Sequence, residues 1–306
     1  MATENREIKS SVFADLFGDD ELDGKKNFLS LYNAIHDTDL KLENTQIIQK
    51  KIPQSVYKTF NNDVSMIING RLIVLIEHQS TPNQNMPLRF LEYYVHILYG
   101  IIPADVRYRE AIFKIPTPEF YVFYNGKSNP KEKEYIMKLS DAFLEPQKEP
   151  LCELKVKFIS ITKEMWQNLP VVQKCDILKQ YCEFMDIVMK YLAEMQEHPT
   201  IEERQGAYEK AIRNAISKGI LTDYLTRKGT EVMNMFIDEY NYDLDMKVKA
   251  EEAEKRGIEK GAQQKAIEAA RSFYANGASI ELIANSLNMT NEQVLEIVKT
   301  KVPAQV

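Results

Sequence analysis

The sequence has few cysteines, no long apolar run and no excess of basic residues, and each shortage argues against a class of protein. Cys152, Cys175 and Cys182 show no C-x-x-C spacing, so a disulfide framework and a structural zinc site are both poorly supported. The longest strictly apolar run covers residues 72–76, whereas a membrane-spanning helix needs about 20 apolar residues. No basic segment followed by an apolar one opens the chain, as a secretory signal would require. We therefore expect a soluble cytoplasmic protein without membrane contact.

The charge balance argues weakly against a passive nucleic-acid coat. The net charge is −6, from 39 basic and 45 acidic residues, whereas such a coat binds through a basic surface. A nuclease is not excluded, because it needs acidic metal ligands in its cleft and only local basic patches beside it. With 306 residues, of which 44% are hydrophobic and 27% charged, the chain has an ordinary globular composition and a length of about two domains.

The first part of the sequence predicts two helices and a β-hairpin. Apolar residues recur every three or four positions over residues 12–17 and 28–35, which is typical of helices. Alternation over residues 64–68 indicates a strand, and Asn69-Gly70 is a strong signal for a two-residue hairpin turn. The β-branched apolar run at 72–76 fits a second strand that is buried on both faces.

A further helix and two strands are expected after the hairpin. The helix covers residues 88–102, and its apolar stripe is expected to consist of Leu91, Val95, Leu98 and Ile102. Strands are expected over residues 120–124 and 154–161. This order predicts an α/β fold with a small mixed sheet flanked by helices.

Three segments follow from these patterns. The α/β core covers residues 1–163, and a helical extension covers residues 164–245. Residues 246–306 carry a long charged helix and a small helical bundle, so the C-terminal part is expected to be all-helical. Within the bundle, Ser279 should cap one helix, and Thr290 with Gln293 should form a capping box for the next.

Two carboxylates stand at corresponding ends of the expected hairpin strands. Asp63 begins the first strand and Glu77 ends the second, so antiparallel pairing brings both residues to one end of the sheet. Two carboxylates, a backbone carbonyl and water make the oxygen-rich environment that Mg²⁺ or Mn²⁺ prefers. His78 is better explained by packing or hydrogen bonding on the reverse face of the strand, and if it has a functional role, its backbone carbonyl is the candidate third ligand. Glu77 and Gln79 are two positions apart and should share one strand face. Asp63 alone is better explained as a solvated acid, but Glu77 follows a buried strand, where α/β sheets commonly bind ligands.

These residues resemble a known family. Asp63, followed fourteen residues later by Glu77-His78-Gln79, is similar to the D…(D/E)-x-K signature of the restriction-endonuclease-like, or PD-(D/E)XK, superfamily. Over roughly residues 8–245 the chain resembles more specifically the Rpn family of recombination-promoting nucleases and putative transposases. The phrases that carry this resemblance are Val12-Phe13-Ala14-Asp15-Leu16-Phe17, Asn62-Asp63-Val64-Ser65, Glu77-His78-Gln79-Ser80-Thr81, Asn85-Met86-Pro87-Leu88-Arg89, Pro116-Thr117-Pro118, Phe123-Tyr124-Asn125-Gly126 and Leu139-Ser140-Asp141-Ala142-Phe143.

The resemblance implies a restriction-endonuclease-like core and a Mg²⁺-dependent endodeoxyribonuclease linked to recombination or mobile elements. Gln79 stands where the superfamily has lysine, as is usual in this family, and glutamine can orient a water but supplies no charge. Arg89 is a candidate for replacing that charge, with Tyr93 one turn further on. A surface ion pair and a core aromatic explain this pair equally well. Asp15 matches the acid that some superfamily members place on the first helix, although a helix-surface acid explains it slightly better.

A second interpretation is a non-catalytic DNA-binding or assembly protein on a decayed nuclease fold, which Gln79 and the acidic net charge favour. The last three helices have a spacing similar to a helix-turn-helix. The presumed recognition helix at 291–300 carries Glu292 and Glu296, so a protein-interaction bundle is favoured over a DNA reader.

The long helix before this bundle carries small residues along one stripe, at Ala250, Ala253, Gly257 and Gly261. Glycine costs ~1 kcal/mol of helix propensity at each site, and this cost is easier to understand if the stripe packs against a partner. We therefore expect a homodimer through the C-terminal helices. A solvated linker is the alternative, because charged residues dominate the other faces.

Overall fold

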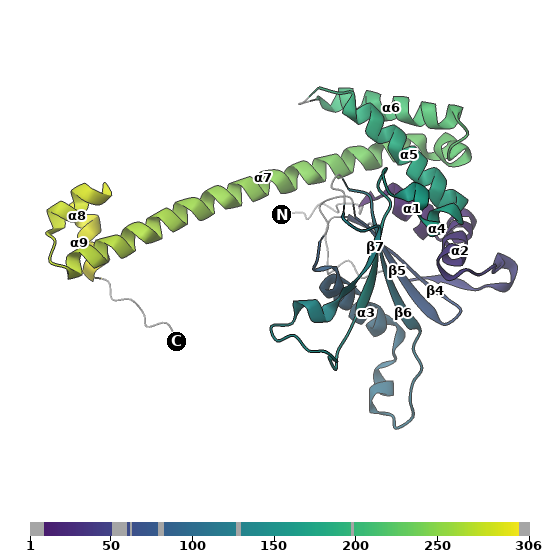
Figure 1. The fold of residues 1–306 in the computed structure, drawn as a ribbon, viewed down its shortest axis with the longest axis horizontal. Helices are drawn as coiled ribbons and strands as arrows, with labels where there is room; N and C mark the ends of the chain where they lie inside the picture. The colour runs from purple at the N-terminus through teal and green to yellow at the C-terminus, as the bar shows by residue number, and fades with distance from the viewer. Residues whose placement is uncertain are drawn as a thin grey trace, which may run out of the picture. The chain divides into compact units, whose positions relative to one another are not determined.

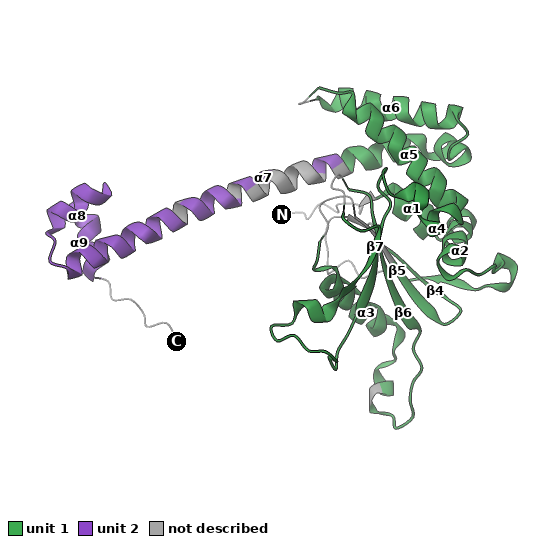
Figure 2. Cartoon of the chain, viewed as in Figure 1, with its two compact units in different colours: residues 1–239 green, residues 240–306 purple. Residues whose placement is uncertain are grey.

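The computed structural model describes residues 9–50, 60–61, 63–78, 83–126, 130–196 and 199–299, some of them as backbone only. The chain forms two compact units, residues 1–239 and residues 240–306 (Figure 2). The first unit is a mixed α/β structure in which helices cover both faces of a six-stranded sheet (Figure 1), so the predicted fold class is confirmed at this level. No helix in the described ranges has both the length and the apolar character needed to cross a membrane.

The sheet combines antiparallel edges with a parallel centre. Its strands lie in the order β2 (Ile47–Gln49), β4 (Asp63–Ile68), β5 (Arg71–His78), β6 (Thr117–Tyr124), β8 (Lys155–Ser160) and β7 (Glu134–Lys138). The pairs β5–β6 and β6–β8 are parallel, and the other three pairs are antiparallel. Separately, β1 (Lys9–Ser10) pairs in parallel with β3 (Phe60–Asn61).

The predicted hairpin is confirmed as β4 and β5. Asn69 and Gly70 have φ angles of 47° and 73°, the combination of two left-handed residues that a type I′ turn requires. Residues 72–74 of β5 are each at most 1% exposed, although neighbouring residues of a strand belong to opposite faces. The strand is therefore buried on both sides, as its apolar run predicts.

Helices α1 (Val12–Gly18) and α2 (Leu22–His36) cover one face of the sheet and confirm the first two predicted helices. On this face Phe13 packs on Phe123, with ring centroids 5.4 Å apart, and shares a core with Met66 of β4. The remaining helices of this core belong to the C-terminal part of the first unit. They are α4 (Pro170–Gln173), α5 (Asp176–Ala193), α6 (Ile201–Ser217) and the start of α7 (Thr222–Ala275).

Helix α3 (Met86–Ile101) covers the other face, but only part of its expected apolar stripe lies there, because Leu91 is partly buried against this core and Val95 is not. Val95 is 41% exposed, and the buried residues of the helix include Phe90, Tyr93 and Ile97. These side chains pack on the face of β5 that carries Leu72. The helix has apolar residues on nearly every side, so periodicity does not identify its buried face, which Phe90 and Tyr93 occupy.

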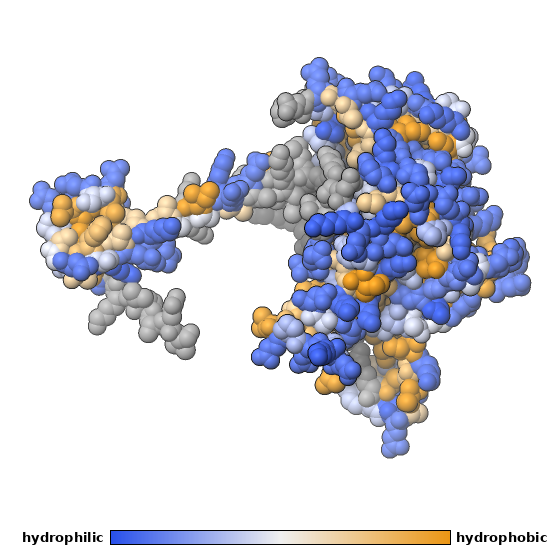
Figure 3. Space-filling model, in the orientation of Figure 1, coloured by the Kyte–Doolittle hydropathy of each residue, from blue (hydrophilic) through white to orange (hydrophobic). Residues whose placement is uncertain are grey.

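The helices after residue 163 share one hydrophobic core with the sheet, so the expected segment 1–163 and residues 164–239 belong to one compact unit. The division between the units lies at residue 239, and the sequence places it at 245. Short 3₁₀ helices connect several elements, at Leu42–Asn44, Ala104–Tyr108, Leu139–Ala142 and Trp166–Asn168. Apolar side chains reach the surface on the loops that precede β6 and β8 (Figure 3).

The second unit contains most of α7 together with α8 (Ile280–Leu287) and α9 (Asn291–Lys299). The predicted caps are confirmed. Ser279 Oγ accepts a hydrogen bond from the Leu282 N–H at 3.3 Å. Thr290 N–H donates to Gln293 Oε1 at 2.9 Å, and Gln293 N–H donates to Thr290 Oγ1 at 3.2 Å. The bundle closes around a small core formed by Ala270, Ile283, Ala284 and Val294.

Candidate functional site

The two acids singled out in the sequence occupy backbone positions at one end of the sheet. Asp63 is the first residue of β4 and pairs with Ile76, the residue immediately before Glu77. On the other side of β5, Glu77 pairs with Phe123 and His78 pairs with Tyr124. The structure describes the backbone of Asp63, Glu77 and His78. Gln79 lies outside the described residues.

The register also shows how the two acid positions are offset. Directly paired residues of antiparallel strands share a face, and successive residues alternate between faces. Because Asp63 pairs with Ile76 and not with Glu77, the two acid positions stand one step out of direct pairing. The backbone therefore places the two acid positions next to each other at the strand ends, on opposite faces of the sheet.

Arg89 and Tyr93, the accessory pair expected on the following helix, contact each other on α3. Arg89 Nε donates a hydrogen bond to Tyr93 Oη at 2.7 Å, and the guanidinium carbon lies 5.2 Å from the centre of the Tyr93 ring. Tyr93 is 1% exposed, so its ring belongs to the core. Arg89 thus packs along the helix over a buried aromatic residue, on the opposite face of the sheet from α1.

Asp15, the other accessory candidate, contacts α7. Its neighbours on α1, including Phe13 and Phe17, are buried against the sheet. The Asp15 carboxylate accepts a hydrogen bond from Tyr224 Oη at 2.8 Å, and Lys228 Nζ lies 3.0 Å and 3.1 Å from its two oxygens. The described contacts of this carboxylate therefore join α1 to the start of α7.

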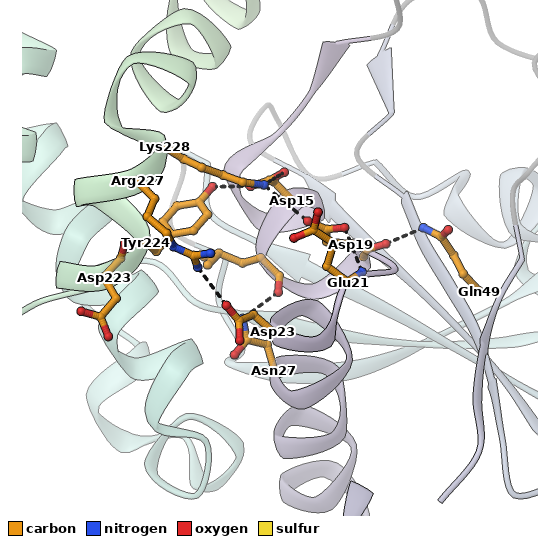
Figure 4. A network of polar contacts seen from close by, with 12 residues as sticks. Asp15, Asp19, Glu21, Asp23, Asn27, Gln49, Asp223, Tyr224, Arg227 and Lys228 are labelled. Atoms are coloured by element: carbon orange, nitrogen blue, oxygen red, sulfur yellow. Dashed lines mark hydrogen bonds and ion pairs between the residues drawn. The ribbon is translucent and has the colours of Figure 1, made fainter.

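Further ion pairs extend this connection into a polar network (Figure 4). Lys228 also lies 3.4 Å from Asp19, which follows α1, and Arg227 pairs with Asp23 of α2 at 2.9 Å. The network lines a cavity of about 370 Å³ between α1, α2 and the start of α7. Sequence reasoning missed it, because Asp15 and Lys228 are 213 residues apart and no local pattern connects them.

The surroundings of Lys228 and Tyr224 favour the protonated form of each side chain, in which both can donate to Asp15. Burial works against the charge on Lys228, but hydrogen bonding and attraction from Asp15, with a further contribution from Asp19, outweigh it and raise the pKa of the lysine. Burial, and secondarily the neighbouring Asp15 carboxylate, raises the pKa of Tyr224 well above its usual range. Tyr224 therefore remains a hydrogen-bond donor to Asp15 at any physiological pH.

A second polar cluster lies near the opposite end of β5 and centres on Glu119 of β6. The Glu119 carboxylate accepts a hydrogen bond from Tyr121 Oη at 2.8 Å and pairs with Arg71. His36 Nε2 lies 2.9 Å from the same carboxylate, and the His36 ring packs on Tyr32. Burial lowers the pKa of His36 in spite of the nearby Glu119.

Among the side chains that the structure describes, no three His, Cys, Asp or Glu residues are grouped so that they could hold a metal ion. The side chains of Asp63 and Glu77 are not among those described. Comparison with protein-family models, with curated proteins and with solved structures found no match to this chain.

Proposed function

We propose that this protein is a metal-dependent endodeoxyribonuclease that hydrolyses phosphodiester bonds in DNA. The observation that carries the proposal is the register of the hairpin, in which Asp63 pairs with Ile76, the neighbour of Glu77. Two carboxylate-bearing positions from adjacent strands thus meet at one end of a buried sheet, a common location for ligand sites in α/β folds. The resemblance to the Rpn family supports DNA as the substrate and a link to recombination or mobile elements.

The available donors suit Mg²⁺ or Mn²⁺. Asp63, Glu77 and the backbone carbonyl of His78 offer only oxygen ligands, which these hard cations prefer. A bound Mg²⁺ would polarise the scissile phosphate and lower the pKa of a coordinated water. In this proposal Gln79 orients the attacking water through its side-chain amide. Arg89 donates to Tyr93 through its Nε, so its charge could still offset negative charge at the phosphate in this proposal.

Plasmid nicking by the purified protein tests the proposal. The wild type should nick supercoiled DNA with Mg²⁺ and not with EDTA, and Asp63→Ala should abolish the activity. Asp39→Ala is the matched control, because Asp39 is 83% exposed and pairs only with the exposed Lys41 among its described ion pairs. Equal traces of activity in the wild type and in Asp63→Ala would indicate a contaminating nuclease and overturn the proposal.

The offset between the two acid positions keeps a second function under consideration. With Asp63 one step out of direct pairing with Glu77, and with glutamine in place of the superfamily's lysine, the fold could serve a non-catalytic DNA-binding or assembly protein. Such a protein would bind DNA in EDTA and retain that binding in Asp63→Ala. A nuclease would lose cleavage in the same variant, so one pair of assays separates the two functions.

We also propose self-association through the C-terminal helices. Ala253, Gly257 and Gly261 of α7 are exposed within the second unit, so this stripe of small residues has room for a close helix partner. A dimer would bring two nuclease centres to one duplex, which suits double-strand cutting. The small bundle that follows is proposed as a protein-interaction module, because α9 carries Glu292 and Glu296.

A further inference from the structure

Two loops of the first unit expose large apolar side chains to an unusual degree. The α3–β6 loop, residues 102–116, carries Tyr108 at 90% exposure and Ile112 at 83%. The β7–β8 loop, residues 139–154, carries Leu144 and Leu151, both fully exposed. Single exposed apolar residues are common on protein surfaces, but groups of them mark interaction sites.

Both loops lie at the same end of the sheet. The first leads into β6 and the second into β8, and these strands are parallel neighbours, with Tyr121 paired to Lys157. Parallel neighbouring strands begin at the same end of a sheet, so the two loops lie on the same side of the molecule (Figure 1). Glu77 and His78 are at the opposite end of β5, which is parallel to β6. The exposed loops are therefore separate from the proposed nuclease centre.

The loops differ in charge. The α3–β6 loop has three basic and two acidic residues, whereas the β7–β8 loop has four acidic residues and one basic residue. Apart from Arg107, whose side chain is not described, the charged residues of both loops are solvent-exposed. An anionic surface such as DNA or an acidic membrane would be repelled by the β7–β8 loop. The α3–β6 loop of a second copy, which has one net positive charge and in which Arg109 pairs with Asp105, would be attracted to it.

We propose that these two loops form a self-association surface, on which the α3–β6 loop of one copy packs against the β7–β8 loop of a second. In a twofold-symmetric pair this contact is made twice, so the apolar residues are covered and loops of opposite net charge face each other in both contacts. This contact is independent of the proposed nuclease activity and of any contact through α7.

Charge exchange between the loops gives a specific test in the full-length protein. Arg109→Glu with Lys114→Glu leaves the α3–β6 loop with one basic and four acidic residues. Glu145→Lys with Glu149→Lys leaves the β7–β8 loop with three basic and two acidic residues. Each variant should halve the mass measured by light scattering, because both loops then carry charge of the same sign. A chain with all four changes, or an equal mixture of the two variants, should recover the wild-type mass.

A wild-type mass equal to one chain, unchanged masses in the two variants, or failure of the mixture to recover the mass would each overturn the proposal. A measurement on the wild type alone covers the case in which a variant fails to fold. Cys152 is exposed in the β7–β8 loop, whereas Cys175 and Cys182 are buried. Its reaction with a maleimide should slow several-fold as protein concentration rises through association. A concentration-independent rate would also contradict the proposed surface.

Discussion

Removal of the Asp15 carboxylate should destabilise the first unit, because it leaves two buried or half-buried donors without their acceptor. Asp15 and Lys228 side chains are 15% and 24% exposed, and Tyr224 donates to the same carboxylate. Breaking a fully buried pair costs about 3–5 kcal/mol, and an exposed pair contributes at most ~1 kcal/mol. For this partly exposed network we expect Asp15→Ala to lower the free energy of unfolding by about 2 kcal/mol, a change of roughly thirtyfold in the unfolding equilibrium.

Urea unfolding followed by circular dichroism measures this loss. Asp20→Ala is the matched control, because Asp20 is 64% exposed and pairs with Lys25 at 2.9 Å, so its removal should change stability by less than ~1 kcal/mol. In a double-mutant cycle with Lys228→Met, the two changes together should cost clearly less than the sum of the separate costs. Equal losses in Asp15→Ala and Asp20→Ala, or additive losses in the cycle, would refute the reasoning.

Four further predictions concern the proposed site, its surroundings and the tail. Glu77→Gln should lower cleavage by several orders of magnitude with an unchanged melting temperature, because metal stabilisation of transition-state charge contributes several kcal/mol; near-normal turnover would remove Glu77 from the site. Gln79→Lys should be tolerated or should raise activity if residue 79 lies beside the metal, and a collapse of the melting temperature would instead indicate a buried lysine. Since the pKa of His36 is lowered in the folded state, the unfolded state binds more protons below about pH 6.5, and stability should fall as the pH drops through this range. His36→Gln should flatten that dependence in urea midpoints measured between neutral and mildly acidic pH, and an identical slope in both proteins would count against it. Deletion of residues 247–306 should lower the number of chains per particle measured by light scattering without removing the nuclease centre, and an equal number in the full-length and truncated chains would exclude the α7 stripe as an assembly surface.

The parts of the fold that the sequence predicts well are those specified by neighbouring residues. The Asn69-Gly70 turn and the apolar run after it identify both strands of the hairpin, and the structure gives the expected antiparallel pairing. The caps at Ser279 and Thr290 are likewise local interactions within a few residues. These local interactions can be predicted from the sequence because both partners lie within a few residues of each other and do not depend on the tertiary structure.

The parts that sequence reasoning missed depend on distant partners. Strands β2 and β7 are short edge strands of three and five residues, and β7 begins and ends with charged residues, so neither shows a clear alternation. Asp15 was identified as a candidate, but its contacts with Tyr224 and Lys228 require the start of α7 to pack on α1. The sequence predicts that Asp63 and Glu77 lie at one end of the hairpin, and it contains no signal for this network.

The two-sided burial of β5 has a consequence for how this chain tolerates insertions and deletions. In a strand with only one buried face, a shift of one residue in the pairing register is strongly destabilising, because it turns the polar residues toward the core. Residues 72–74 are buried on either face, so the middle of β5 would accept a shifted alignment with little change in hydrophobic burial. The length of the Asn69-Gly70 turn therefore determines the pairing register of β4 and β5. A single inserted residue there would leave a sheet with similar hydrophobic burial in which Asp63 no longer pairs with Ile76.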